Sequence, residues 1–335
     1  MRKKFLTLLS IFTAFLPLKA FAHIRYLVEE NDFTGQLGGD KQFLMEVFNS
    51  PHNMVLILST VAVAALLFII AQVIPFCKQE ISTIREKADN YVEFIPWILR
   101  LSLGIALIGA GTGGWLISPA FPGYTYLGLI QILLGFFMLA GLLIAPVILI
   151  TILLYVFALT KDFYAIGNFE VLAAAVALLF LNHKRPGVDD LLNIPNITTA
   201  LQRFRSIIPL ILRVGIGGAM VFLGIYEKML NPHVTEMVIK NFGLMNVVPV
   251  DVHMWVFATG IIEVVLGTAL ILGLRTRLVT AVTFIVLTLS FFYFGEEVSS
   301  HVTLFGVLSA LFITRGGRFS LDNRFEMVNP HFAQN

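Results

Sequence analysis

The chain contains nine apolar runs that are long enough, or nearly long enough, to cross a lipid bilayer. They lie near residues 54–74, 94–116, 127–143, 146–160, 169–182, 207–226, 253–274, 278–294 and 301–314. A spanning helix needs about 20 apolar residues, and a compact bundle tolerates shorter ones. Hydrophobic residues make up 57% of the chain and charged residues 13%, against roughly 45–50% and 25% in soluble proteins. The sequence therefore predicts an all-α polytopic membrane protein with about nine transmembrane helices.

The two ends of the chain are predicted to lie on opposite sides of the membrane. Residues 1–22 resemble a signal peptide, with three basic residues, an apolar stretch and Ala20-Phe21-Ala22 as a cleavage site. The mature amino terminus would then lie outside and the carboxy terminus in the cytoplasm. Basic residues follow the same orientation, because most of those in loops fall on the predicted inner side: Lys78, Arg85, Lys87, Lys184, Arg185, Arg203, Arg205, Arg275, Arg277, Arg315, Arg318 and Arg324.

A spaced set of residues occurs twice and indicates an internal duplication. Arg213, Gly217, Gly224 and Pro232 repeat Arg100, Gly104, Gly111 and Pro119 at an offset of 113 positions, and Gly135, Gly141, Phe180 and Asp190 recur as Gly267, Gly273, Phe312 and Asp322 at an offset of 132. The chain is thus expected to comprise an outer segment, lead helix and inner loop (23–93), a first four-helix unit (94–182), a cytoplasmic linker (183–206), a second four-helix unit (207–325) and a cytoplasmic tail (326–335). Both units start and end inside, so the repeat is parallel.

The second unit carries the charged residues that the first lacks. Arg213 and Glu263 lie on glycine-containing faces of two apolar helices, and a charge at mid-membrane costs roughly 2.5–3.5 kcal/mol on insertion scales. We therefore expect an Arg213–Glu263 ion pair or a water-bridged equivalent, with either a structural or a functional role. The first unit has Gln131, Trp115 and Ala145 in place of Glu263, Lys228 and Arg277, which favours the second unit as the location of a site.

The second unit resembles the DoxX/DoxD-like membrane protein family. The resemblance rests on the following ordered residues: Leu212-Arg213, Gly224-x-x-x-Lys228, Glu263-x-x-x-Gly267, Gly273-Leu274-x-Thr276-Arg277, a helix led by His301, and Gly317-Arg318-Phe319-Ser320-Leu321-Asp322. It implies four-helix bundles in the prokaryotic plasma membrane, some of them similar to the small subunit of thiosulfate:quinone oxidoreductase. The implied site comprises Glu263, Arg213 and His301 for proton and quinone chemistry, with Gly224, Lys228 and Arg277 holding the cofactor.

Histidines in the predicted outer segments suggest an alternative, metal-binding site. His23, His233 and His253 lie there, and imidazole suits copper or zinc. None of the histidine spacings forms an HxH or HExxH motif, and ordinary surface histidines explain the pattern equally well. The single cysteine, Cys77, excludes a disulfide within the chain.

Three functions remain open from the sequence. The first is a bilayer-embedded subunit that supports quinone-linked redox chemistry with a partner redox enzyme. The second is proton-coupled transport or periplasmic copper or zinc handling, and the third is a non-catalytic membrane scaffold. The net charge of +2 gives no support for nucleic-acid binding.

Overall fold

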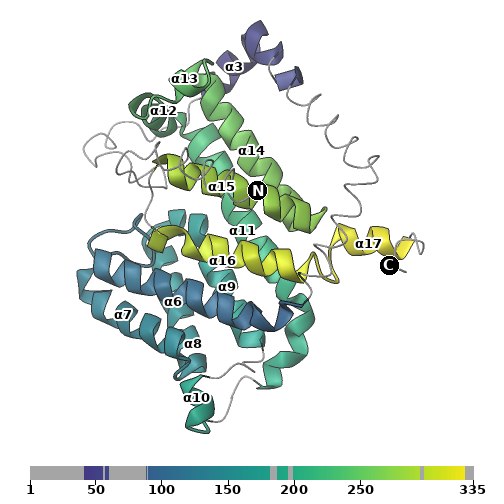
Figure 1. The fold of residues 1–335 in the computed structure, drawn as a ribbon. Coiled ribbons are helices and arrows are strands. Elements are labelled where there is room, and N and C mark those ends of the chain that lie inside the picture. Colours follow the sequence, from purple (N-terminus) through teal and green to yellow (C-terminus); the bar gives the residue numbers. More distant parts are fainter. Residues whose placement is uncertain are drawn as a thin grey trace, which may run out of the picture.

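The fold is an all-α membrane bundle, as the apolar runs predict (Figure 1). The computed structural model describes residues 41–55, 57–59, 88, 90–181, 187–194, 199–294 and 298–328. Within these ranges, six helical segments are long and apolar enough to cross a membrane, and two more are apolar but shorter. The predicted signal peptide and most of the predicted lead helix lie outside the described residues.

The first unit consists of four apolar helices joined by short loops: α6 (Ile95–Gly113), α7 (Thr125–Ala140), α8 (Ile144–Lys161) and α9 (Phe169–Phe180). A 3-10 segment, η2 (Val92–Phe94), precedes α6, and another, η3 (Phe163–Asn168), precedes α9. Pro96 lies in the first turn of α6, where a missing backbone N–H has no cost. Gly114 and Gly141 end α6 and α7 in the left-handed conformation that glycine adopts without strain.

The second unit has the same order of helices and three extra elements between its first two. The four helices are α11 (Ile208–Leu223), α14 (Val252–Leu272), α15 (Thr276–Phe294) and α16 (Val298–Thr314). A 3-10 segment, η4 (Thr199–Ile207), leads into α11. The chain between α11 and α14 forms η5 (Gly224–Leu230), α12 (Pro232–Asn241) and α13 (Leu244–Val247).

Glycines bring the first two helices of each unit into backbone contact. In the first unit Gly104 faces Gly135 and Gly111 faces Gly128, and in the second Gly217 faces Gly267 and Gly224 faces Gly260. A Cβ added at any of these eight glycines would lie 2.5–3.2 Å from the carbonyl oxygen of its partner. Small residues allow such an approach, and the four pairs are related by the sequence offsets of 113 and 132 positions.

The two units interlock and do not form separate bundles. The first helix of each unit packs against the last helix of the other, so α6 contacts α16 and α11 contacts α9. One continuous hydrophobic core contains residues of both units, including Leu103, Leu178, Leu212 and Leu308. The first unit therefore supports the second through direct packing.

The side chains of Asp189 and Asp322 cap the amino-terminal end of the third helix of each unit. Asp322 accepts hydrogen bonds from the backbone N–H groups of Arg275 and Thr276 at 2.5 and 2.8 Å, and Asp189 accepts those of Leu143 and Ile144 at 2.7 and 3.0 Å. The predicted match of Asp190 with Asp322 is therefore wrong by one residue. Asp189 belongs to the short helix α10 (Val188–Leu191), and Asp322 to α17 (Leu321–Val328).

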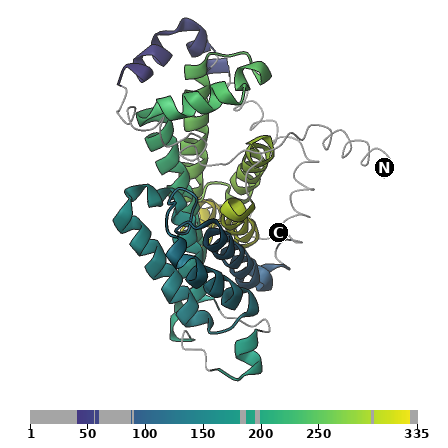
Figure 2. The same cartoon turned by 90° about the vertical axis from the view of Figure 1, so that its left-hand side faces the viewer.

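Short helices cover one end of the second unit. The helix α3 (Lys41–Asn49) lies beside α12 and α13, and the three form a layer over the ends of η5 and α14 (Figures 1 and 2). Phe43 and Val47 of α3 are buried there against Ile239 of α12 and Val256 and Phe257 of α14. This layer shields the residues at that end of α11 and α14 from water.

Candidate functional site

A π-helical segment continues α11 beyond Leu223 and forms the framework of the site. It begins at Gly224 and ends at Leu230. The wider turn of a π-helix is rare and is frequently found at functional sites. Gly224 is needed here, because a Cβ would lie 2.8 Å from the carbonyl oxygen of Gly260 and 3.1 Å from the Cβ of Glu263. The close approach brings the side chains that follow Gly224 against α14.

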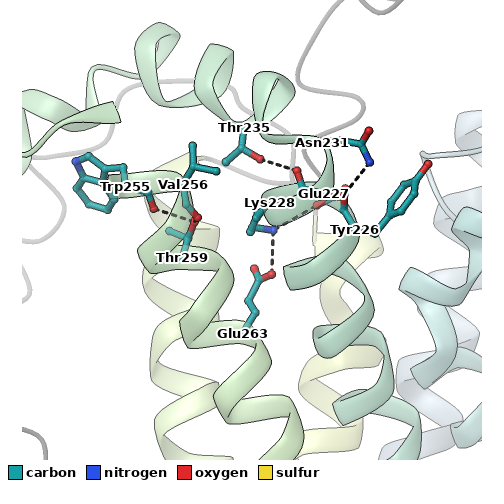
Figure 3. Close-up of polar contacts among 9 residues, drawn as sticks. All are labelled: Tyr226, Glu227, Lys228, Asn231, Thr235, Trp255, Val256, Thr259 and Glu263. Atoms are coloured by element: carbon teal, nitrogen blue, oxygen red, sulfur yellow. Dashed lines mark hydrogen bonds and ion pairs between the residues drawn. The ribbon is translucent and has the colours of Figure 1, made fainter. Parts of the chain in front are cut away.

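One lysine lies between two carboxylates in this segment (Figure 3). The Nζ atom of Lys228 lies 2.9 Å from Oε2 of Glu263 on α14 and 3.3 Å from Oε2 of Glu227. The side chains of Lys228 and Glu227 are each 7% exposed, and that of Glu263 is 27% exposed. We call Glu227, Lys228 and Glu263 the lysine cluster. It is nearly enclosed, and Glu263 forms its accessible edge.

The elements above the lysine cluster fix its geometry. The hydroxyl of Thr235 on α12 donates a hydrogen bond of 3.3 Å to the backbone carbonyl of Glu227. The side-chain amide of Asn231 donates one of 2.8 Å to the carbonyl of Tyr226. Both bonds hold the end of the π-helix under the covering layer, while the Tyr226 side chain points away from Glu263 (Figure 3).

The lysine cluster combines ionisable groups of opposite charge. It contains two carboxylates and one ammonium. Buried charge is costly in a water-poor environment, so a carboxylate of the cluster is a favourable place for the uptake of a proton. The arrangement is suited to holding and releasing a proton next to a fixed hydrogen-bond donor.

The first unit uses the corresponding positions for a neutral contact. Gln131, at the position of Glu263, donates a 2.6 Å hydrogen bond to the carbonyl of Trp115 and accepts one of 2.9 Å from the N–H of Ile117. Here α6 ends at Gly113, and the chain turns into a loop where α11 continues as the π-helix. In both units a polar residue at this position of the second helix thus binds the chain that follows the first helix: Gln131 binds the loop after α6, and Glu263 binds Lys228 of η5.

The predicted Arg213–Glu263 ion pair is wrong. Arg213 is fully buried at the carboxy-terminal end of α14, where it donates hydrogen bonds to the carbonyls of Leu270 (3.5 Å), Ile271 (2.9 Å) and Phe319 (3.1 Å). Arg100 makes the equivalent bonds to Met138 and Leu139 at 3.1 and 3.2 Å. The last carbonyls of a helix lack intrahelical partners, so both arginines serve as helix caps, and Lys228 provides the positive charge for Glu263.

Arg277 and His301 are not part of the lysine cluster. Arg277 donates hydrogen bonds to the carbonyls of Phe312 and Ile313 at 2.7 and 3.1 Å and so caps α16. His301 is buried in the first turn of α16, where its Nδ1 lies 2.8 Å from the Ser300 hydroxyl and its ring packs on Phe291. Of the predicted site residues, the structure brings together Gly224, Lys228 and Glu263.

The predicted metal-binding histidines do not form a ligand set in the part of the chain that the structure describes. No group of three or more His, Cys, Asp or Glu residues there could hold a metal ion. His253 contacts Glu46 and Glu236, each at 3.4 Å, and so links α14 to α3 and α12. His23 lies outside the described residues.

Two buried carboxylates are missing from the site residues predicted from sequence. Glu227 precedes Lys228 and is 6% exposed, and its burial depends on the π-helix and the covering layer. Glu170 starts α9 and is 1% exposed. The signal for Glu170 was an acidic residue within the apolar run 169–182, where ionisable residues are rare.

Comparisons with known proteins identify a domain in the second unit. Residues 208–296 match the model of the DoxX family. The matched segment runs from α11 into the end of α15, so it includes the whole lysine cluster and Arg277 and stops before His301. No curated protein and no solved structure matches the chain.

Proposed function

Because residues 208–296 are a DoxX domain within an integral membrane protein, we propose that the chain is a membrane subunit that supports quinone-linked redox chemistry with a partner enzyme. The observation that carries the proposal is the lysine cluster, in which one buried ammonium is shared by two carboxylates from two elements. The partner enzyme would supply the electrons, and the lysine cluster would handle a proton.

The surroundings of Glu263 fit an apolar ligand that dissolves in the bilayer. The Glu263 side chain is 27% exposed, and Ile262 and Val265, which are turned about 100–160° away from it on α14, are 45% and 58% exposed and face lipid. A molecule in the bilayer therefore reaches the accessible edge of the lysine cluster without crossing water. On the other side of the π-helix, the rings of Phe222 and Tyr226 stack with their centroids 5.3 Å apart. This stacking restricts the movement of the segment.

The roles of the cluster residues follow from their chemistry. A bound quinone would supply two-electron, two-proton chemistry. Lys228 is a fixed donor that can bind a carbonyl oxygen, and Glu263, once it has taken up a proton, is the carboxylic acid that can deliver this proton to that oxygen. Glu227 keeps Lys228 charged and oriented when Glu263 is neutral. Arg213, which the sequence suggested for quinone chemistry, instead donates both of its Nη groups to backbone carbonyls.

Quinone binding by the full chain in lipid nanodiscs tests the proposal. The probes are a short-tailed ubiquinone and a short-tailed menaquinone, with binding followed by quenching of tryptophan fluorescence. We expect Glu263→Gln and Lys228→Met to weaken binding at least tenfold. Glu236→Gln is the matched control, because Glu236 lies on the covering helix α12 and contacts Lys240 and His253 outside the cluster.

Two outcomes contradict the redox proposal and separate it from the other functions. Equal quinone affinity in the wild type and both cluster variants would remove the cluster from quinone chemistry. Proton flux in sealed vesicles that Glu263→Gln abolishes, without any quinone binding, would indicate proton-coupled transport. If neither activity is found, and both variants still bind a partner enzyme as the wild type does, the protein is a scaffold.

A further inference from the structure

A second buried carboxylate lies in the first unit, at its junction with the second. Glu170 occupies the first turn of α9 and is 1% exposed. The helix α9 packs against α11, where Gly215 leaves room for Ala173 and for the backbone of Phe169 and Glu170. Glu170 is thus enclosed by both units within a helical segment apolar enough to cross the bilayer.

Among the described residues, Glu170 has polar neighbours but no cation paired with it. The side chain of Asn168 and the backbone N–H of Glu170 itself donate hydrogen bonds to its carboxyl group. Tyr155 on α8 is a titratable neighbour of Glu170, and its hydroxyl donates a 2.7 Å hydrogen bond to the carbonyl of Ala165. Glu170 is absent from the ion pairs of the described residues, and its Oε2 atom has no hydrogen-bond partner among them.

The environment of Glu170 differs from that of Glu227 and Glu263. Those two carboxylates share the ammonium of Lys228. An ionised carboxylate without a cation is among the most costly groups to bury, and such a group usually takes up a proton instead. The oxygen without a partner is where a carboxylic acid would carry this proton.

We propose that Glu170 is a second proton-binding site, held as a neutral acid in the resting protein and open to proton exchange. The site is particular to the first unit, because at the offset of 132 positions the second unit has Val302. Each unit then has an ionisable site on a different helix: the second unit on α14 and η5, and the first on α9. The two sites lie on connected elements, since Tyr164 of η3 contacts Tyr226 of η5 with ring centroids 6.2 Å apart.

Infrared spectroscopy of the full chain in nanodiscs tests this site without any quinone. A protonated carboxylic acid has a carbonyl stretching band separate from those of carboxylates and amides. We expect this band in the wild type at neutral pH, a shift to lower frequency in D₂O as the proton exchanges, and a reversible loss as the pH is raised. Glu170→Gln should remove the Glu170 component, and Glu263→Gln should leave it unchanged.

Two results would overturn the proposal. The first is a spectrum of Glu170→Gln that superimposes on the wild type in the carboxylic acid region. The second is a band that belongs to Glu170 but does not shift in D₂O, because the acid would then be closed to exchange. Glu170→Met, which removes the carboxyl group and fills a similar volume, provides the same spectral comparison if the glutamine variant does not fold. Failure here leaves quinone binding at the lysine cluster untouched, so the two proposals fail separately.

Discussion

Replacing Gly217 by alanine tests the backbone contact between α11 and α14. The new Cβ would lie 2.5 Å from the carbonyl oxygen of Gly267 and 2.8 Å from Cγ1 of Ile271. Both distances are shorter than ordinary van der Waals contact, so the two helices must move apart by several tenths of an ångström. The neighbouring Gly218 provides a matched control, because its Cβ would meet Cδ1 of Phe169 at 3.4 Å, within the ordinary range.

The difference between the two variants isolates the cost of the contact. Each substitution replaces glycine by alanine inside the same helix, and the gain in helix propensity of about 1 kcal/mol is common to both. Overpacking typically costs about 1–3 kcal/mol. We therefore expect Gly217→Ala to be less stable than Gly218→Ala by about 1–3 kcal/mol.

Equilibrium unfolding in mixed micelles of mild detergent and dodecyl sulfate measures this difference. Helical circular dichroism follows the transition, and the tryptophan fluorescence provides a second probe. Equal stability of the two variants would refute the close approach of α11 and α14. The same approach positions Gly224 and Glu263, so the lysine cluster would then need another explanation.

Three further changes probe the helix caps and the lysine cluster by the same unfolding assay. Asp322→Ala and Asp189→Ala should each lower the free energy of unfolding by about 0.5–2 kcal/mol, because a helix N-cap is lost. Asp190→Ala should cost less, because among the described residues Asp190 accepts a hydrogen bond only from Gly187. Equal costs for Asp189→Ala and Asp190→Ala would contradict the corrected repeat. Arg213→Met should cost at least about 1–3 kcal/mol because buried carbonyls lose their donor, and a neutral effect would disprove the cap. Lys228→Met should cost about 3–5 kcal/mol because it removes the cation that is paired with Glu263, so a stable variant would show that Glu263 is already neutral.

Much of the fold could be predicted from hydrophobicity and glycine spacing. Eight of the predicted apolar runs correspond to helices within the described residues, and glycines at matching offsets form matching contacts. These features are local or periodic, so a sequence records them directly. The interlocking of α6 with α16 and of α11 with α9 could not be predicted in this way, because apolar helices of one unit fit equally well against either unit.

The site was predicted less well, because two buried charges can pair only if they lie at the same depth in the membrane, and the sequence does not fix this depth. Arg213 and Glu263 each lie on a glycine face and carry opposite charges, which suggested a pair. Glu263 lies near the middle of α14 and binds Lys228, whereas Arg213 binds the carboxy-terminal end of α14, about two turns away. The π-helix, which turns Lys228 toward Glu263, has no signature that sequence periodicity would reveal.

The central claim is that Glu263 is paired with Lys228 and not with Arg213, and two double-mutant cycles test it most directly. One cycle combines Glu263→Gln with Lys228→Met, and the other combines Glu263→Gln with Arg213→Met. We predict a coupling free energy of about 0.5–3 kcal/mol in the first cycle and additivity within about 0.3–0.5 kcal/mol in the second. Additivity for Lys228 together with strong coupling for Arg213 would contradict the account.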